Sequence, residues 1–326
     1  MRDVFWQDKR VFVTGCTGLL GSWLTADLVA KGAHVIGLIR DRVKKSELVR
    51  SGTINYIDTV DGDVSDYALM ERVLAEYEID TVFHLAAQTT VPVANRVPMP
   101  TFETNIKGTW VLLEAARRNP TVARVVVASS DKAYGPQEKL PYCEDAPLAG
   151  RHPYDVSKSC ADLIARAYAY TYNLPVAVTR CANMYGGGDL NWNRLIPGTV
   201  RSVLRGERPV VRSDGTLKRD YIFVKDALRG YLVLARNLAR PEVQGQAFNL
   251  GMDQPVTVLE MIETIIKISD YPHLEPVILN EARNEIQDQY LSSAKAQCVL
   301  GWTPEYTPAS GLAETMTWYR QFLSET

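Results

Sequence analysis

The chain has few of the residues that build metal centres and disulfide frameworks. Its 326 residues include only five cysteines and four histidines, all widely scattered. No Cys-x-x-Cys pair occurs, so the sequence predicts neither a zinc site nor a set of disulfides, and no bound metal is expected. Unpaired thiols are typical of a reducing compartment, and we therefore expect a cytoplasmic protein.

The sequence also lacks a dominant charge and a long apolar run. With 36 basic and 38 acidic side chains the net charge is −2, so no basic field favours nucleic acid or an anionic membrane as a partner. No stretch of about 18 apolar residues would span a bilayer. No apolar run followed by a cleavage site lies near residue 1, so no signal peptide is expected.

What the chain does contain is a repeated alternation of strand and helix patterns. Short apolar runs predict strands at residues 10–14, 33–39, 54–60, 81–85, 124–128, 175–179 and 247–250. Helical spacing predicts helices at residues 67–77, 105–118, 154–172, 198–205, 224–238 and 257–269, whereas residues 212–219 indicate a loop. Apolar strands that alternate with helices predict an α/β fold with a doubly wound parallel sheet of about seven strands, a Rossmann sheet.

The alternation of strand and helix patterns becomes less regular after residue 180, which predicts two regions. Residues 1–180 with about 220–252 would form a dinucleotide-binding domain. Residues 181–219 with 253–326 would form a smaller, C-terminal substrate lobe over the carboxyl ends of the strands, where such sheets bind ligands.

A glycine-rich turn follows the first predicted strand directly. Gly15, Gly18 and Gly21 form a G-x-x-G-x-x-G pattern that opens a helix. Glycine lets the backbone approach a pyrophosphate closely, and the helix N-terminus offers N–H groups and a positive dipole. The pattern predicts a dinucleotide site that includes Thr17, Leu19 and Leu20, although tight turn packing alone would also account for the glycines.

The choice between NAD and NADP stays open. After the second predicted strand, Arg40 would hold a 2′-phosphate or lie on the adenine, whereas Asp41 would reach a ribose hydroxyl. Asp63 and Val64 after the third strand are candidates for the adenine edge. A solvated loop, or a turn aspartate at position 63, is the alternative for these residues.

A tyrosine and a lysine lie one helical turn apart, at Tyr154 and Lys158. A lysine ammonium beside a phenol is expected to lower the pKa of the phenol towards working pH. Tyr154 would then accept the proton of a sugar hydroxyl during hydride transfer. A surface pair on an amphipathic helix is the structural alternative.

Ser130, Asp131 and Lys132 follow the fifth predicted strand. Ser130 would bond the same substrate oxygen as Tyr154. Hydride transfer does not explain the carboxyl and the amine, but elimination of water does: Lys132 would be the base, and Asp131 the acid, which needs a raised pKa. A salt bridge within a loop is the alternative.

These motifs resemble the extended short-chain dehydrogenases/reductases along nearly the whole chain. The shared motifs are Thr14-Gly15-x-x-Gly18-x-x-Gly21, His84-Leu85-Ala86-Ala87, Asn105-Ile106-x-Gly108-Thr109, Tyr154-x-x-x-Lys158 and Arg180-x-x-Asn183-x-Tyr185-Gly186. Within that superfamily the chain is most similar to the CDP-glucose 4,6-dehydratases. That likeness is carried by Phe5-Trp6-x-x-Lys9-Arg10, Ser130-Asp131-Lys132, Tyr154-Asp155-Val156-Ser157-Lys158 and Gly186-Gly187-Gly188-Asp189.

The resemblance implies a reaction and a set of roles. An NDP-hexose, CDP-glucose above all, would be oxidised at C4, lose water across C5–C6 and receive the hydride back at C6, with NAD or NADP held tightly and recycled. Tyr154 and Lys158 would act at C4, with Lys158 also on a cofactor ribose, Asp131 at the C6 hydroxyl and Lys132 at C5. Leu85, Ala86 and Ala87 would line the cofactor, and Asn183, Arg194 and Arg219 would bind the sugar diphosphate. For both arginines a solvated loop charge is the alternative. A homodimer is the family expectation.

Two departures leave the nucleotide base and the sugar open. The glycine loop reads Cys16-Thr17-Gly18-Leu19-Leu20-Gly21 where many of these dehydratases have His-Thr-Gly-Phe-Lys-Gly. Arg219-Asp220-Tyr221-Ile222-Phe223 replaces their Arg-Pro-Trp-Gln-His. A nucleotide-sugar 4-epimerase or decarboxylase, and a non-catalytic dinucleotide sensor, are the alternative functions.

Overall fold

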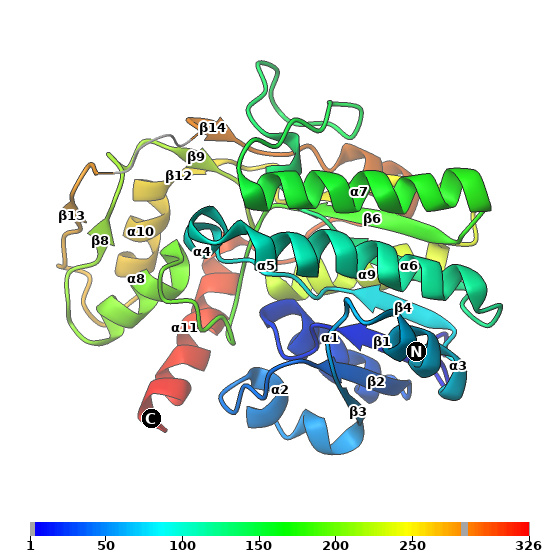
Figure 1. The fold of residues 1–326 in the computed structure, drawn as a ribbon. Coiled ribbons are helices and arrows are strands. Elements are labelled where there is room, and N and C mark those ends of the chain that lie inside the picture. The colour runs from blue at the N-terminus through cyan, green and yellow to red at the C-terminus, as the bar shows by residue number, and fades with distance from the viewer. Residues whose placement is uncertain (1–3, 282–285, 326) are drawn as a thin grey trace.

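The computed structural model of the protein describes residues 4–281 and 286–325, and a seven-stranded sheet forms its centre (Figure 1). All strands of this sheet run parallel, in the order β11-β6-β5-β4-β1-β2-β3. The order changes direction between β1 and β4, where a doubly wound sheet opens a crevice for ligands. The predicted fold class is confirmed.

The sheet strands are short, apolar and rich in β-branched residues, which suits a sheet covered on both faces. Their bounds are β1 (Arg10–Thr14), β2 (His34–Ile39), β3 (Asp58–Asp61), β4 (Thr81–His84), β5 (Arg124–Ala128), β6 (Val176–Cys181) and β11 (Ala247–Leu250). Side chains of β1 alternate between two core clusters: Val11 and Val13 belong to one and Phe12 to the other. This alternation places one hydrophobic core on each face of the sheet.

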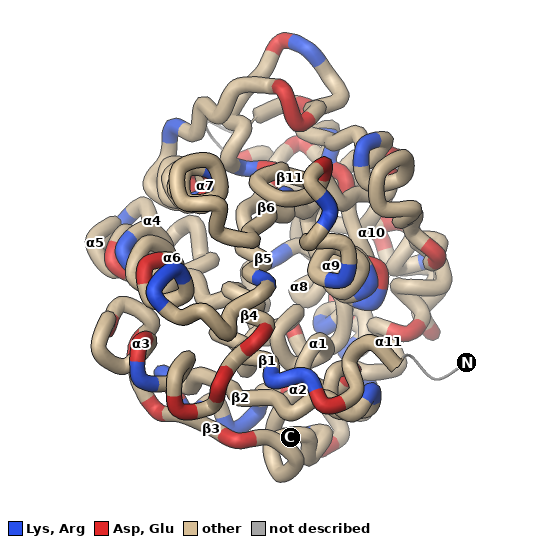
Figure 2. The backbone as a smooth tube through the Cα atoms, turned by 90° about the vertical axis from the view of Figure 1, so that its right-hand side faces the viewer, with Lys and Arg blue, Asp and Glu red and all other residues tan. Residues whose placement is uncertain are grey.

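Helices cover both faces, as Figure 2 shows end-on. One face carries α3 (Tyr67–Glu76), α6 (Gly108–Arg118) and α7 (Pro153–Tyr172), and the other carries α1 (Leu19–Ala30) and α9 (Val224–Asn237). Shorter helical segments join these layers. They are α2 (Glu47–Arg50), η1 (Thr53–Tyr56), α4 (Val91–Arg96), α5 (Pro98–Phe102), η2 (Glu103–Lys107), η3 (Asp131–Tyr134) and η4 (Ala296–Leu300).

A smaller group of elements lies beside the carboxyl ends of the sheet strands (Figure 1). Its helices are α8 (Leu195–Leu204), α10 (Val258–Lys267) and α11 (Pro308–Ser324). Its strands are β7 (Asn183–Tyr185), β8 (Val210–Val211), β9 (Lys218–Arg219), β10 (Tyr221–Phe223), β12 (Val256–Thr257), β13 (Val277–Ile278) and β14 (Asp288–Gln289). They pair as β10-β7, β12-β9-β14 and β13-β8. Within the described residues, no helix is long and apolar enough to span a bilayer.

Three predicted elements differ from the structure, and one long helix was not predicted. Residues 54–60 were predicted as one strand, but Gly52 has φ +75° and starts the helical turn η1, so β3 begins only at Asp58. Helix α8 begins at Leu195, three residues early, because Pro197 lies in its first turn, where the missing N–H costs nothing. The predicted loop at 212–219 ends in β9, and the helix α11 was not predicted.

Candidate active site

The turn between β1 and α1 is shaped by close backbone contacts. Gly15 has φ +73°, and a Cβ built on it would lie 2.8 Å from the Ala86 nitrogen. A Cβ on Gly21 would lie 2.1 Å from the Gly15 oxygen. A Cβ on Gly18, in contrast, would meet only that oxygen, at 3.3 Å. The chain itself requires Gly15 and Gly21, whereas the open side of Gly18 leaves room for a ligand against the backbone.

The start of α1 is suited to an anion. Gly18 is the N-cap residue, no side chain caps the helix, and its first turn, from Leu19, contains no acidic residue. The first N–H groups and the positive end of the helix dipole are therefore not met by a side-chain cap or by a carboxylate of the same turn. The neighbouring backbone is held by Thr14, whose Oγ1 accepts hydrogen bonds from the nitrogens of Leu85 and Ala86 at 3.1 Å each. This cradle fits the pyrophosphate of a dinucleotide.

The residues expected at the adenosine end lie at the edge of the sheet near β2 and β3. Arg40 forms an ion pair with Asp41, with 2.7 Å between Nε and Oδ2, and both side chains are more than half exposed. Asp63 accepts a hydrogen bond from the Ser65 nitrogen at 2.8 Å, and Val64 is buried. Arg40 and Asp41 are thus paired with each other at the solvent-exposed edge of the sheet.

Tyr154 and Lys158 lie in the first turns of α7, and both are buried. The Lys158 Nζ donates a hydrogen bond to the Ala128 oxygen at 2.8 Å, and burial lowers the pKa of Lys158 to about 8. Burial raises the pKa of Tyr154 to about 12, although the charge of Arg194 and a hydrogen bond with Ser130 act in the opposite direction. The predicted lowering of the Tyr154 pKa by Lys158 is wrong here, because burial outweighs the nearby charges and the ammonium is bonded to Ala128.

The Ser130-Asp131-Lys132 run forms the turn η3 after β5. Ser130 Oγ donates to Asp131 Oδ1 at 2.9 Å. Asp131 is only 2% exposed, and its Oδ2 is buried without a hydrogen-bond partner among the described residues. Burial raises the pKa of Asp131, against the opposing charge of Lys132. A buried carboxyl that favours its protonated form is suited to donate a proton.

Lys132 reaches across to the smaller group of elements. Its Nζ donates to Oε1 of Gln289 at 2.6 Å, and Gln289 in β14 is fully buried. Among the residues with described positions, Asp131 and Lys132 form no ion pair with each other. The loop salt bridge that the sequence left open as an alternative is therefore absent from this turn.

Two arginines extend this polar centre. Arg219 is 6% exposed in β9, where its Nη1 donates to the Lys218 oxygen at 2.8 Å, and its charge acts to lower the pKa of Asp131, which burial raises. Arg194 precedes α8 and bonds Asp189 Oδ2 through Nη1 at 3.1 Å. Asn183 lies in β7, and its Nδ2 donates to the Asp220 backbone oxygen at 3.2 Å.

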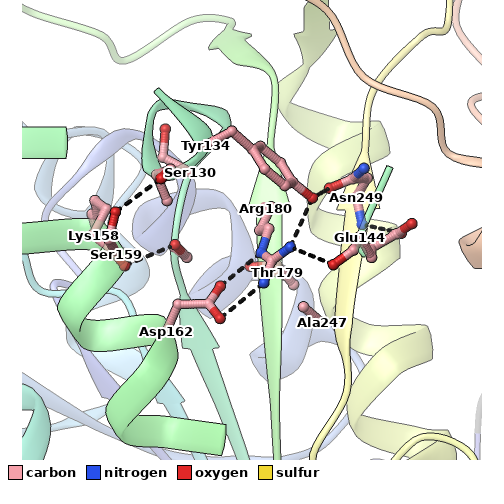
Figure 3. A network of polar contacts seen from close by, with 12 residues as sticks. Ser130, Tyr134, Glu144, Lys158, Ser159, Asp162, Thr179, Arg180, Ala247 and Asn249 are labelled. Atoms are coloured by element: carbon pink, nitrogen blue, oxygen red, sulfur yellow. Dashed lines mark hydrogen bonds and ion pairs between the residues drawn. The ribbon is translucent and has the colours of Figure 1, made fainter. Parts of the chain in front are cut away.

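A buried network fixes the segment that follows η3 (Figure 3). Arg180 forms two hydrogen bonds with Asp162, at 2.8 and 3.0 Å, and both side chains are fully buried. Arg180 Nη1 also donates to Tyr134 Oη at 2.8 Å, and Tyr134 Oη donates to Asn249 at 2.7 Å. The network joins η3, α7, β6 and β11 behind the site, so Arg180 supports the scaffold.

Sequence patterns missed Gln289 and Asp162. Gln289 stands 157 positions from Lys132, and no spacing rule connects a two-residue strand to a distant lysine. Asp162 lies on the α7 face that carries Lys158. An aspartate on this buried helix face was the only sequence feature that indicated a buried ion pair. Within residues 4–281 and 286–325, no group of three or more His, Cys, Asp or Glu side chains is arranged to hold a metal ion.

Residues 11–251 match the family described as the NAD dependent epimerase/dehydratase family, and the chain belongs to it. Within that family it groups with the nucleotide-sugar 4,6-dehydratases, which confirms the resemblance. The CDP-glucose 4,6-dehydratase of Salmonella typhimurium is 31% identical, over 98% of this chain and 92% of that protein. The dTDP-glucose 4,6-dehydratase of Neisseria gonorrhoeae is 33% identical, over 95% of each chain.

Solved structures show the same architecture. The UDP-glucose 4-epimerase of Thermotoga maritima, solved with UDP-glucose, has a TM-score of 0.87 and 28% identity, over 96% of this chain and 99% of that one. The dTDP-glucose 4,6-dehydratase of Bacillus anthracis, solved with NAD, has a TM-score of 0.82 and 28% identity, over 96% and 97%.

Proposed function

We propose that the protein is an NDP-hexose 4,6-dehydratase that acts on CDP-glucose and gives the NDP-4-keto-6-deoxyhexose. The observation that carries this proposal is the buried Asp131, with one oxygen held by Ser130 and the other without a hydrogen-bond partner among the described residues. An epimerase or a decarboxylase has no elimination for this carboxyl and the neighbouring Lys132 to perform. A protein that only senses a dinucleotide has no use for Tyr154.

The cofactor would lie along the glycine loop. The open side of Gly18 and the uncapped start of α1 would receive the pyrophosphate, with Leu19 and Leu20 contributing backbone N–H groups and Leu85 to Ala87 lining the opposite side. NAD or NADP, when bound, would supply a reversible hydride acceptor. Lys158 would hold a ribose hydroxyl and orient the cofactor beside Tyr154.

The residues of the site would carry the proton transfers of the reaction. Tyr154 would take the proton of the C4 hydroxyl, whose oxygen Ser130 also bonds. Lys132 would take the proton from C5, which the C4 ketone acidifies. Asp131 would protonate the C6 hydroxyl, which leaves as water, and its raised pKa keeps that proton available. Return of the hydride to C6 and of a proton to C5 completes the product.

The diphosphate would lie between two arginines. Arg219 and Arg194 come from β9 and from the start of α8, and the charge of each acts on a group of the site, Asp131 and Tyr154 respectively. Planar guanidinium groups suit paired contacts with phosphate oxygens. Asn183 would contribute an amide contact to the same diphosphate.

The nucleotide base is proposed from the Asp131-Lys132 pair. The dTDP-glucose dehydratases that the chain resembles have Asp-Glu at this position, whereas the CDP-glucose group has Asp-Lys. The identities, 31% to a CDP-glucose and 33% to a dTDP-glucose dehydratase, do not separate the two substrates. Turnover of CDP-, dTDP-, GDP- and UDP-glucose, compared by the appearance of a 4-keto product, tests this choice.

The reaction itself is tested by incubating the protein with CDP-glucose in deuterated water. Dehydration predicts deuterium at C5 and a methyl group at C6, both visible by NMR. An inverted C4 with an intact C6 hydroxyl would identify an epimerase and refute the proposal. Tyr154→Phe is the control variant, which should retain bound cofactor and lose turnover by about 100-fold or more.

We also propose that the protein is a homodimer through α6 and α7. These helices pack together and expose several large apolar side chains: Trp110, Leu163, Tyr170 and Tyr172. Exposed apolar groups on adjacent helices are typical of an interface. Sedimentation of the wild-type chain and of a Leu163→Glu/Tyr170→Glu variant tests it, since only the variant should sediment as a monomer.

A further inference from the structure

Gln289 is a fully buried amide in contact with the proposed base. It lies in β14, opposite Arg219 of β9, and its Oε1 accepts the hydrogen bond of Lys132 at 2.6 Å. Since the amine of a lysine side chain donates its N–H groups, this contact fixes which branch of the amide carries the oxygen. The other branch, Nε2, must then be the donor.

Nε2 of Gln289 is buried and has no hydrogen-bond partner among the residues that the structure describes. A buried donor without an acceptor loses its hydration without compensation, and an apolar side chain of the same size would avoid that cost. A glutamine at this position is therefore explained if a ligand supplies the acceptor.

A second unpartnered polar atom belongs to the same region. Asp131 Oδ2 is also buried without a partner among the described residues, and Asp131 precedes Lys132, the residue that Gln289 contacts. Tyr142 is buried as well, and the charges of Asp131 and Arg219 act on its phenol, whose pKa is raised by burial. The unsatisfied atoms of Asp131 in η3 and Gln289 in β14 would both be met by one polar ligand.

We propose that Gln289 is a substrate-contacting residue: its carbonyl oxygen orients the amine of Lys132, and its amide N–H groups bind an oxygen of the nucleotide sugar. The first part, the orientation of the Lys132 amine, rests on the proposed dehydratase function. A neutral amine that donates one N–H to Gln289 keeps its lone pair free for the C5 proton. The neutral carbonyl suits this role, because a carboxylate in its place would favour the charged ammonium, which cannot act as a base.

The experiment compares Gln289→Met, Gln289→Glu and the control Gln287→Met. Gln287 is exposed two residues away, and its side chain bonds Thr216. Each variant is measured for thermal unfolding, for the Kd of CDP-glucose by calorimetry, and in single turnovers. There, the absorbance of the reduced nicotinamide reports oxidation at C4, and loss of C6 hydroxyl reports elimination.

Gln289→Met should slow elimination by about 100-fold while C4 oxidation keeps its rate, so that reduced cofactor accumulates. Its Kd for CDP-glucose should rise about 5-fold, the effect of one lost hydrogen bond. Gln289→Glu should move the rising limb of the elimination rate about one unit or more to higher pH. Gln287→Met should match the wild type in all three measurements.

Two results would overturn the proposal. The first is a Gln289→Met enzyme with the Kd and the elimination rate of the wild type. The second is a Gln289→Met enzyme in which C4 oxidation and elimination slow equally and the melting temperature falls, together with a Gln289→Glu enzyme whose elimination rate shows no pH shift. That combination would show that Gln289 has only a structural role. A wild-type protein that binds CDP-glucose but forms no methyl product would instead refute the dehydratase function, while the Kd of Gln289→Met would still test the substrate contact.

Discussion

The buried Arg180–Asp162 pair gives the sharpest prediction for stability. Both side chains are fully buried and are joined by two hydrogen bonds, at 2.8 and 3.0 Å. Arg180→Met would leave the Asp162 carboxylate buried without a counter-charge, because among the described residues only Arg180 bonds to it. Breaking such a pair by removing one partner typically costs about 3–5 kcal/mol. We expect the free energy of unfolding to fall by that amount.

A matched double variant compares the stability cost of removing both charges with the cost of removing only one. Arg180→Met/Asp162→Leu removes both charges, and replacing a buried pair by apolar side chains is often neutral or stabilising by about 1–4 kcal/mol. The double variant should therefore recover most of the stability. Arg72→Met is the surface control: Arg72 and Glu76 form an exposed pair one helical turn apart, worth less than about 1 kcal/mol.

The assay is urea unfolding followed by circular dichroism at a constant m-value. Two outcomes would contradict the reasoning. One is an Arg180→Met variant no less stable than Arg72→Met. The other is a double variant as unstable as Arg180→Met alone, which would assign the loss to the Tyr134 and Glu144 contacts of Arg180.

Three further predictions concern the site and its surroundings. Gly18→Ala should raise the Kd of NAD, measured by calorimetry, by about 10- to 100-fold with little loss of stability. Gly21→Ala should lower the melting temperature in thermal unfolding, since its Cβ would collide with Gly15. Burial lowers the pKa of Lys158 to about 8, so kcat/KM should fall above that pH as the lysine loses its charge. Arginine stays charged, so the Lys158→Arg variant should have a lower kcat/KM overall but should not show this fall. Burial raises the pKa of Asp220 from 3.8 to about 7, so the folded state binds more protons than the unfolded state between these values, and stability should fall as pH rises through that window. Asp220→Asn should remove this slope in denaturation at several pH values and gain on the order of 2–4 kcal/mol at pH 8; a slope unchanged in the variant would contradict the assignment.

Local signals predicted the parts of the site that lie close together in the chain. The glycine turn after β1, the start of α7 and the turn after β5 are each defined by neighbouring residues, so their spacing was enough. The seven strands follow from apolar runs, but β3 at the sheet edge buries only Val60, and its boundary was therefore weakly marked.

Other parts depend on contacts between distant segments. Gln289 meets Lys132 only because β14 pairs with β9, and two-residue strands leave no periodic pattern. The pKa of Tyr154 was predicted from Lys158 alone, whereas its direction depends on burial by several elements. Burial of this kind is a property of the folded chain and cannot be read from a four-residue spacing.

Return of the C4 hydrogen to C6 is measured with CDP-glucose that carries deuterium at C4. The reaction is run in ordinary water and the product is examined by NMR and mass spectrometry. We expect a 4-keto sugar with the deuterium in its C6 methyl group, because the hydrogen removed from C4 returns within the same site. Deuterium that stays on C4 with inverted configuration, or a C6 methyl group without the label, would contradict it.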